Sequence, residues 1–126
     1  MDITGLRIGN FVSLKLLGEF ETLEEIWVER QIKVSEFFRA YHHPEEVEPI
    51  KLTEKWLMNF GIDPSHKIGI SRRFYALGYN LHFEICPESI GVYFKGELMC
   101  FITYVHQLQN LYFSLLDEEL EYKKIL

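Results

Sequence analysis

Five histidines and two cysteines are the residues of this 126-residue chain best suited to bind a metal or to catalyse a reaction. Only His42-His43 with Glu45-Glu46 form a cluster, in the segment AYHHPEEVEP. Zinc sites place their ligands at short, regular spacings, and this segment has none of them, so a solvated polar loop is the favoured interpretation. Cys86 and Cys100 fit no metal or redox motif and are expected to be free thiols in a reducing cytoplasm. The sequence therefore predicts no metal site and no cofactor.

Motifs for catalysis are also missing from the sequence. No glycine-rich phosphate-binding loop follows a predicted strand. Ser71, Ser89 and Ser114 lack the strand–turn–helix context of a nucleophile elbow. Paired carboxylates such as Glu24-Glu25 and Glu118-Glu119 are adjacent in sequence, which is typical of a solvated surface. We expect no catalytic residue, and an enzyme with an unrecognised site stays as one alternative.

A basic and aromatic cluster suggests a second alternative, a small nucleic-acid-binding module. Its members are Lys67, Arg72, Arg73 and Tyr75. Antiparallel sheets with exposed aromatic rings and nearby arginines stack single-stranded bases in several known modules. The net charge of −6 opposes phosphate binding, and a charged strand edge explains the same residues. We therefore expect no nucleic acid among the partners but leave the alternative open.

The N-terminal part of the chain is predicted to be rich in β-strands. Apolar residues alternate in LRIGNFVSLKLL, with a turn or bulge at Gly9-Asn10, and further strands are predicted in FETLEEIWV and in QIKVSEFF, residues 31–38. The prolines and polar residues of Ala40–Pro49 mark a seam. The prediction is a single domain, 1–126, with lobes at residues 1–48 and 49–126.

The middle of the chain predicts a short helix followed by a meander. In KLTEKWLMNFGI, Thr53 is an N-cap residue and Gly61 is the left-handed stop. A turn is predicted at Asp63-Pro64-Ser65. Strands are then expected in GISRRFYAL, YNLHFEI, IGVYF and LMCFI, with a hairpin turn at Lys95-Gly96-Glu97.

The last long helix is predicted in TYVHQLQNLYFSLL, residues 103–116, and its polar side is unusual. One arc of about 140° is apolar. The other arc has no full charge, and it contains His106, Gln107, Gln109, Asn110 and Phe113. Amides satisfy buried backbone groups without the desolvation cost of a charge, so we expect this face to be covered. Either the N-terminal strands or the 40–49 loop cover it, or these five residues form a partner interface. A plain solvated face is the third alternative.

Three segments carry a resemblance to a known family: LRIGN, PIKLTEKWLMNFGI and YVHQLQNLYFSLLDEEL. They resemble a family of short proteins from gut anaerobes, their phages and their mobile elements, whose usual forms are PIPLTEEWLLKFGF and YVHQLQNLYFALTGEEL. The match covers about a third of the chain, in order. Asp117 departs from it, because the family carries glycine there, where a helix stop is natural. The family has no assigned activity, so the resemblance implies kinship with mobile elements and no catalytic residues.

These observations combine into one prediction. The fold class is α+β: an antiparallel β-meander packed by a long C-terminal helix, with an N-terminal β-barrel-like or curled-sheet lobe and one short helix. We expect a cytoplasmic protein, because the chain has neither the long apolar run of a membrane helix nor a signal peptide. The expected function is a non-enzymatic interaction or accessory role, with an unknown protein or a second copy as the partner.

Overall fold

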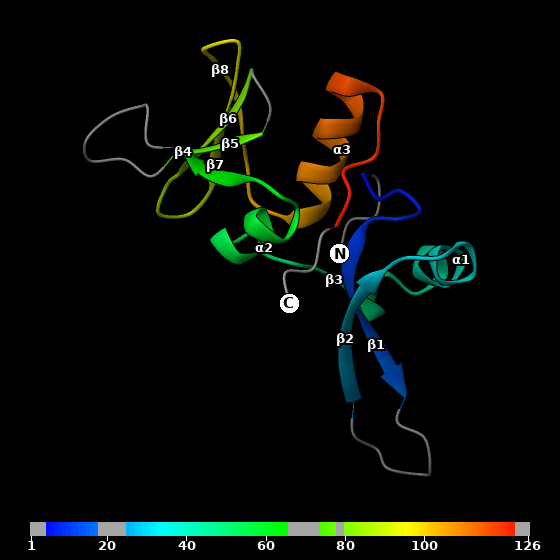
Figure 1. Cartoon of the computed structure of the whole chain (residues 1–126). Coiled ribbons are helices and arrows are strands. Elements are labelled where there is room, and N and C mark those ends of the chain that lie inside the picture. The colour runs from blue at the N-terminus through cyan, green and yellow to red at the C-terminus, as the bar shows by residue number, and fades with distance from the viewer. Residues whose placement is uncertain (1–4, 18–24, 66–73, 78–79, 123–126) are drawn as a thin grey trace. The chain divides into compact units, whose positions relative to one another are not determined.

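The computed structural model describes residues 5–17, 25–65, 74–77 and 80–122, and it has the predicted α+β class (Figure 1). The chain divides into two compact units. The first comprises residues 1–50 and 104–117, and the second comprises 51–103 and 118–126. The C-terminal helix is thus grouped with the N-terminal sheet, whereas the sequence grouped it with the meander. No helix in the described ranges is long and apolar enough to cross a membrane.

The first unit contains an open, three-stranded antiparallel sheet in the order β2-β1-β3. Its strands are β1 (Phe11–Leu17), β2 (Glu25–Gln31) and β3 (Val47–Pro49). Leu14 pairs with Val28 on one side and with Val47 on the other. Because strand side chains alternate between the two faces, Val12 and Leu14 enter the core together. The central strand β1 therefore contributes two apolar side chains to the core of this unit.

The segment after β2 is a helix, α1 (Val34–His42), so the strand predicted for residues 31–38 is wrong beyond Gln31. The Lys33 N–H donates to the Glu36 carboxylate at 3.1 Å and begins the helix. The apolar residues of QIKVSEFFRAY fit the helical spacing as well as the alternating one, and packing decides between them. Ala40 is buried and Phe37 packs against the core, which consists of Leu6, Val12, Leu14, Ile32, Ala40 and Val47. A short 3-10 helix (Pro44–Glu46) leads into β3.

Helix α3 (Val105–Leu116) completes the first unit and packs on β1. The Val105 N–H donates to the Ile50 carbonyl at 2.8 Å, which holds the start of the helix. Val105 and Leu108 are fully buried. The helix ends where Asp117 adopts a left-handed φ of 54° and its N–H donates to the Phe113 carbonyl. The predicted stop therefore exists with aspartate in the position where the resembled family has glycine.

The second unit contains a five-stranded antiparallel meander in the order β4-β5-β6-β7-β8. Its strands are β4 (Asp63–Ser65), β5 (Phe74–Leu77), β6 (Leu81–Ile85), β7 (Ile90–Phe94) and β8 (Glu97–Ile102). The turn predicted at residues 63–65 is wrong, because this segment pairs with β5 as an edge strand. The β7–β8 hairpin is confirmed. Lys95 and Gly96 both have positive φ, which is the geometry of a tight type I′ turn.

Helix α2 (Glu54–Asn59) has the ends that the sequence predicts. The Thr53 hydroxyl accepts from the Trp56 N–H at 3.5 Å. Gly61 has a φ of 80°, and the Ile62 N–H donates to the Leu57 carbonyl at 3.0 Å. Such a Schellman ending satisfies carbonyls that the last turn leaves free. Fully buried Leu57 attaches this short helix to its unit.

The left-handed conformation of Asp117 gives a stability prediction. We expect Asp117→Gly to raise the free energy of unfolding by about 0.5 kcal/mol, because relief of the left-handed strain exceeds the entropy cost of glycine. Glu118→Gly is the control, since Glu118 is the exposed neighbour and is not at positive φ. Urea unfolding measures both. Equal loss of stability in the two variants would show that the Asp117 backbone carries no strain.

Candidate functional site

A tight turn at Arg7–Asn10 positions the first group of candidate residues. The Asn10 N–H donates to the Arg7 carbonyl at 3.1 Å, and the Arg7 N–H donates to the Asn10 side-chain oxygen at 2.6 Å. Gly9 supplies the φ of 96° that this turn requires. The Gly9 N–H donates to the Ile32 carbonyl, and the Ile32 N–H donates to the Asn10 carbonyl, both at 2.8 Å. The turn predicted at Gly9-Asn10 is therefore confirmed and is attached to the end of β2.

Gln109 of α3 bonds to the backbone of this turn and is 1% exposed. Its side-chain oxygen accepts from the Phe11 N–H at 2.8 Å and from the Asn10 amide at 3.5 Å. Its side-chain NH₂ donates to the Gly9 carbonyl at 3.1 Å. A carboxamide is suited to this position because it donates and accepts at once without a buried charge.

Asn110 and Arg7 extend the same network. The Asn110 side-chain oxygen accepts from Arg7 Nε at 2.6 Å and from the Asn10 amide at 3.0 Å, while its NH₂ donates to the Gly5 carbonyl. The Arg7 guanidinium also lies 4.6 Å from the centre of the Phe113 ring. We call Arg7, Asn10, Gln109 and Asn110 the amide cluster. It joins segments about a hundred residues apart in sequence.

The amide cluster shows where the five predicted interface residues lie. Gln109 and Asn110 bond to the N-terminal turn of the same chain, which is the intramolecular alternative for this face. His106 is buried beside the Tyr104 ring, with the ring centroids 5.9 Å apart. Gln107 is exposed and accepts from the Tyr104 N–H, and Phe113 is 37% exposed. A partner interface on this face stays a prediction for the exposed surfaces of these last two residues.

The residues predicted to contact nucleic acid are described only in part. Lys67, Arg72 and Arg73 lie outside the described residues. Tyr75 is 5% exposed, and its hydroxyl donates to the Glu54 carboxylate at 2.8 Å. The Tyr75 ring is therefore covered within its own unit and does not present a face on which a base could stack.

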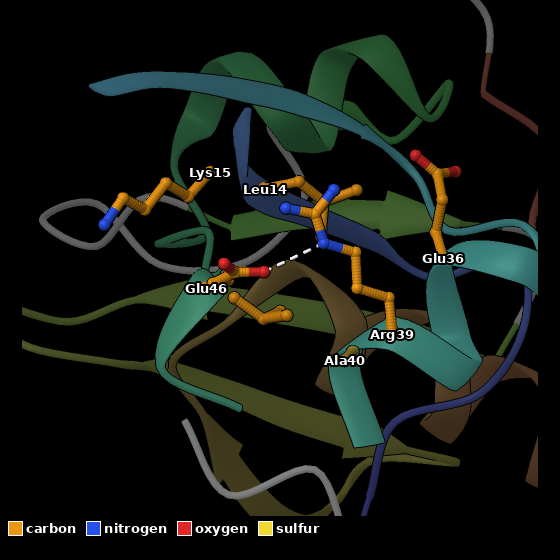
Figure 2. A pocket seen from close by; sticks show the side chains of 7 residues that line it. Leu14, Lys15, Glu36, Arg39, Ala40 and Glu46 are labelled. Carbon is orange, nitrogen blue, oxygen red and sulfur yellow. Dashed lines mark hydrogen bonds and ion pairs between the residues drawn. The ribbon is translucent and has the colours of Figure 1, made fainter. Parts of the chain in front are cut away.

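A small hollow lies beside α1 in the first unit (Figure 2). Its volume of about 20 Å³ is room for one or two water molecules. At its rim Arg39 Nε lies 2.9 Å from a Glu46 carboxylate oxygen. The hydrogen bond from Arg39 lowers the pKa of Glu46, which keeps this carboxylate ionised at neutral pH and makes it a poor proton donor. The hollow is lined by Leu14, Lys15, Glu36, Arg39, Ala40, Glu46 and Val47.

A second hollow lies in the second unit, between the start of α2 and the turn that joins β6 to β7. Its volume of about 50 Å³ holds a few water molecules. Cys86 is part of its wall, and its thiol donates to the Glu84 carbonyl, with the sulfur and the oxygen 3.7 Å apart. Among the described residues, no three His, Cys, Asp or Glu side chains come together as a metal site.

The three most exposed large hydrophobic side chains of the described residues lie on helix α1, and sequence reasoning missed this surface. Val34, Phe38 and Tyr41 are 69%, 67% and 65% exposed. They follow the i, i+4, i+7 spacing, so they lie along one side of the helix. We call them the α1 row. The row was missed in the sequence because Val34 and Phe38 also fit the alternating pattern of a strand. The signal for a helix is the helical spacing of the apolar residues Val34, Phe37, Phe38 and Tyr41.

Ion pairs flank the α1 row. Arg30 Nε lies 3.2 Å from Glu36, and Arg39 Nε lies 2.9 Å from Glu46. The His42 ring contacts both aromatic members of the row, with centroids 4.6 Å from Phe38 and 5.4 Å from Tyr41. An aromatic surface of this kind, rimmed by charged groups, has the anatomy of a protein contact site.

Strand β8 exposes a second, smaller apolar surface. Leu98, Met99 and Phe101 are about half exposed, and a Cβ added at Gly91 would lie 3.4 Å from the Phe101 ring. The register of β7 with β8 shifts at Val92/Tyr93. Such a bulge twists an edge strand and discourages pairing with another strand. This surface is therefore a weaker candidate than the α1 row.

The chain was compared with known proteins at the level of families, sequences and folds. No protein-family model, curated protein or solved structure matches it. The resemblance to the family of short proteins from gut anaerobes and their mobile elements therefore stays a prediction.

Replacing Gln109 tests the amide cluster. We expect Gln109→Leu to lower the free energy of unfolding by about 2–4 kcal/mol, because the buried Phe11 N–H loses its acceptor. Gln107→Leu is the matched control on the exposed side of α3, with a loss below about 1 kcal/mol. Chemical unfolding of both variants makes the comparison. Similar losses would contradict a special role for Gln109.

Buried His106 gives a pH prediction. Burial lowers the pKa of His106 below its ordinary value of 6.5, and its Nδ1 has no hydrogen-bond partner among the described residues. As the pH falls below 6.5 the unfolded chain therefore binds the proton before the folded chain does, and stability is lost. We expect His106→Phe to lose less stability than the wild type between pH 7.5 and pH 5.5, a range of about one unit on either side of 6.5. Identical pH dependence in urea unfolding would contradict this assignment.

Proposed function

We propose that the protein is a non-enzymatic interaction or accessory protein and that the α1 row is its contact surface. The observation that carries the proposal is the exposure of Val34, Phe38 and Tyr41, each about two-thirds accessible on one side of a nine-residue helix. Aromatic side chains bury large areas in complexes and are enriched among the residues that dominate binding energy. An aromatic row left in water is best explained by a partner that covers it.

The fold of the first unit supports this proposal, because α1 does not need the row for its own packing. Ala40 lies in the core and Phe37 packs against it, whereas the three residues of the row are about two-thirds exposed. The row therefore adds apolar surface that contributes little to folding. Residues in such a position can bind a partner without loss of the fold. Leaving their apolar side chains in water is unfavourable, and a partner that covers them would remove this cost.

The alternative of a nucleic-acid-binding module has less support. The net charge is −6, and the Tyr75 ring is covered. The two cysteines are free thiols, which is typical of a reducing cytoplasm, and we propose that the protein acts there. Following the resemblance of its three motifs, we further propose that a mobile element or its host encodes it.

Photo-crosslinking tests the proposed contact surface. A photoreactive phenylalanine analogue replaces Phe38 in cells that carry the gene, and the same analogue at exposed Glu29 of β2 is the control. We expect covalent adducts from position 38 and few from position 29. Phe38→Glu, in turn, should change the free energy of unfolding by less than about 0.5 kcal/mol, because the ring is outside the core. Absence of adducts at position 38 would overturn the proposed function.

A further inference from the structure

We infer that the partner of the α1 row is a second copy of this chain, which packs its own α1 antiparallel against the first. This inference rests on the proposed function and names its partner. It commits to a two-fold symmetric contact, in which the same surface of both copies meets.

The spacing of the row fits a two-fold axis. Phe38 lies close to the midpoint between Val34 and Tyr41 along the helix axis. Its distance from that midpoint is about half a residue, or less than about 1 Å at a rise of 1.5 Å per residue. Antiparallel α1 helices therefore place Val34 against the partner subunit's Tyr41. The two Phe38 rings meet near the axis. A small side chain opposite a large one on either side of a central aromatic pair gives even packing along the contact.

Charge favours the antiparallel over the parallel arrangement. Lys33 is exposed at the start of α1, while exposed Glu45, which lies 3.4 Å from His43 Nδ1, follows its end. Glu36 and Arg39 are already paired within the unit. In the antiparallel arrangement, the basic end of each helix approaches the acidic end of its partner. The two-fold symmetry makes this contact occur twice in the dimer. A parallel arrangement would place like charges together.

The exposed area predicts a weak dimer. Two aromatic side chains of about 150–250 Å² each, two-thirds exposed, offer about 200–330 Å² per copy. Val34 adds to this value. The total for both copies stays below the roughly 1,200 Å² that separates stable interfaces from transient ones. Dimers should therefore appear only at high micromolar concentration.

The other surfaces of the described chain are less suited to hold the second copy. The polar face of α3 is bonded to the turn at residues 7–10 of its own chain. The β8 surface has a bulge at its edge. The α1 row has neither a covering segment among the described residues nor a bulge.

Cysteine pairing tests the predicted register in a background of Cys86→Ser and Cys100→Ser. In a glutathione redox buffer, we expect Phe38→Cys to form a disulfide-linked dimer by itself, because facing positions near a two-fold axis come within disulfide reach. Val34→Cys should pair poorly with itself but well when mixed with Tyr41→Cys. Glu29→Cys is the control for random collision. Strong self-pairing of both Val34→Cys and Tyr41→Cys would indicate parallel helices and would overturn the inference.

Sedimentation equilibrium up to about 1 mM tests the dimer itself. We expect Phe38→Glu to abolish it and Lys33→Glu to weaken it about fivefold or more, since the contact occurs twice. Adding Glu45→Lys to Lys33→Glu should restore the wild-type affinity. A wild-type protein that is monomeric throughout, at low salt, would overturn the inference. If photo-crosslinking from position 38 still gives adducts with another protein, the proposed function survives that failure. If it gives no adduct, both fail.

Discussion

The first unit depends on the hydrogen bonds that Gln109 makes to the turn before β1. The Phe11 N–H and the Gly9 carbonyl lie beside α3, and one uncharged carboxamide satisfies both. Arg7 and Asn110 close the network around it. Since the polar face of α3 is used to hold the N-terminal turn, it offers little surface for a partner. The contact surface that we propose lies elsewhere, on α1, where Val34, Phe38 and Tyr41 are the most exposed large apolar side chains of the described residues.

Local chemistry made much of the fold predictable. The cap at Thr53, the stop at Gly61 and the hairpin turn between β7 and β8 each depend on a few neighbouring residues, and all three are present, although the turn is Lys95-Gly96 and Glu97 already belongs to β8. The covered amide face of α3 was predictable for a related reason, because a helix face without charge is a poor surface for water. The sequence did not decide whether the N-terminal strands or the 40–49 loop cover this face. Hydrogen bonds between residues about a hundred positions apart leave no periodic signal in the sequence.

The errors occurred where tertiary packing decides between two patterns. Residues 31–38 alternate like a strand, but the core accepts Phe37 and Ala40 from one side of a helix. Asp63-Pro64-Ser65 has the composition of a turn, yet it pairs with β5, where proline is tolerated at a sheet edge. The first error hid the α1 row. A helical interpretation of the same residues would have shown three large apolar side chains on the solvent side.

Concentration-dependent NMR spectra test the division between the interior α3 face and the exterior α1 row most directly. Between about 50 μM and 1 mM, where weak complexes form, the backbone amide signals of residues 34–42 should shift. The amide signals of Phe11, Gln109 and Asn110 should remain unchanged over the same range. Shifts at Gln109 and Asn110 with an unchanged α1 would contradict the account, because they would place the contact on the face that is assigned here to the interior.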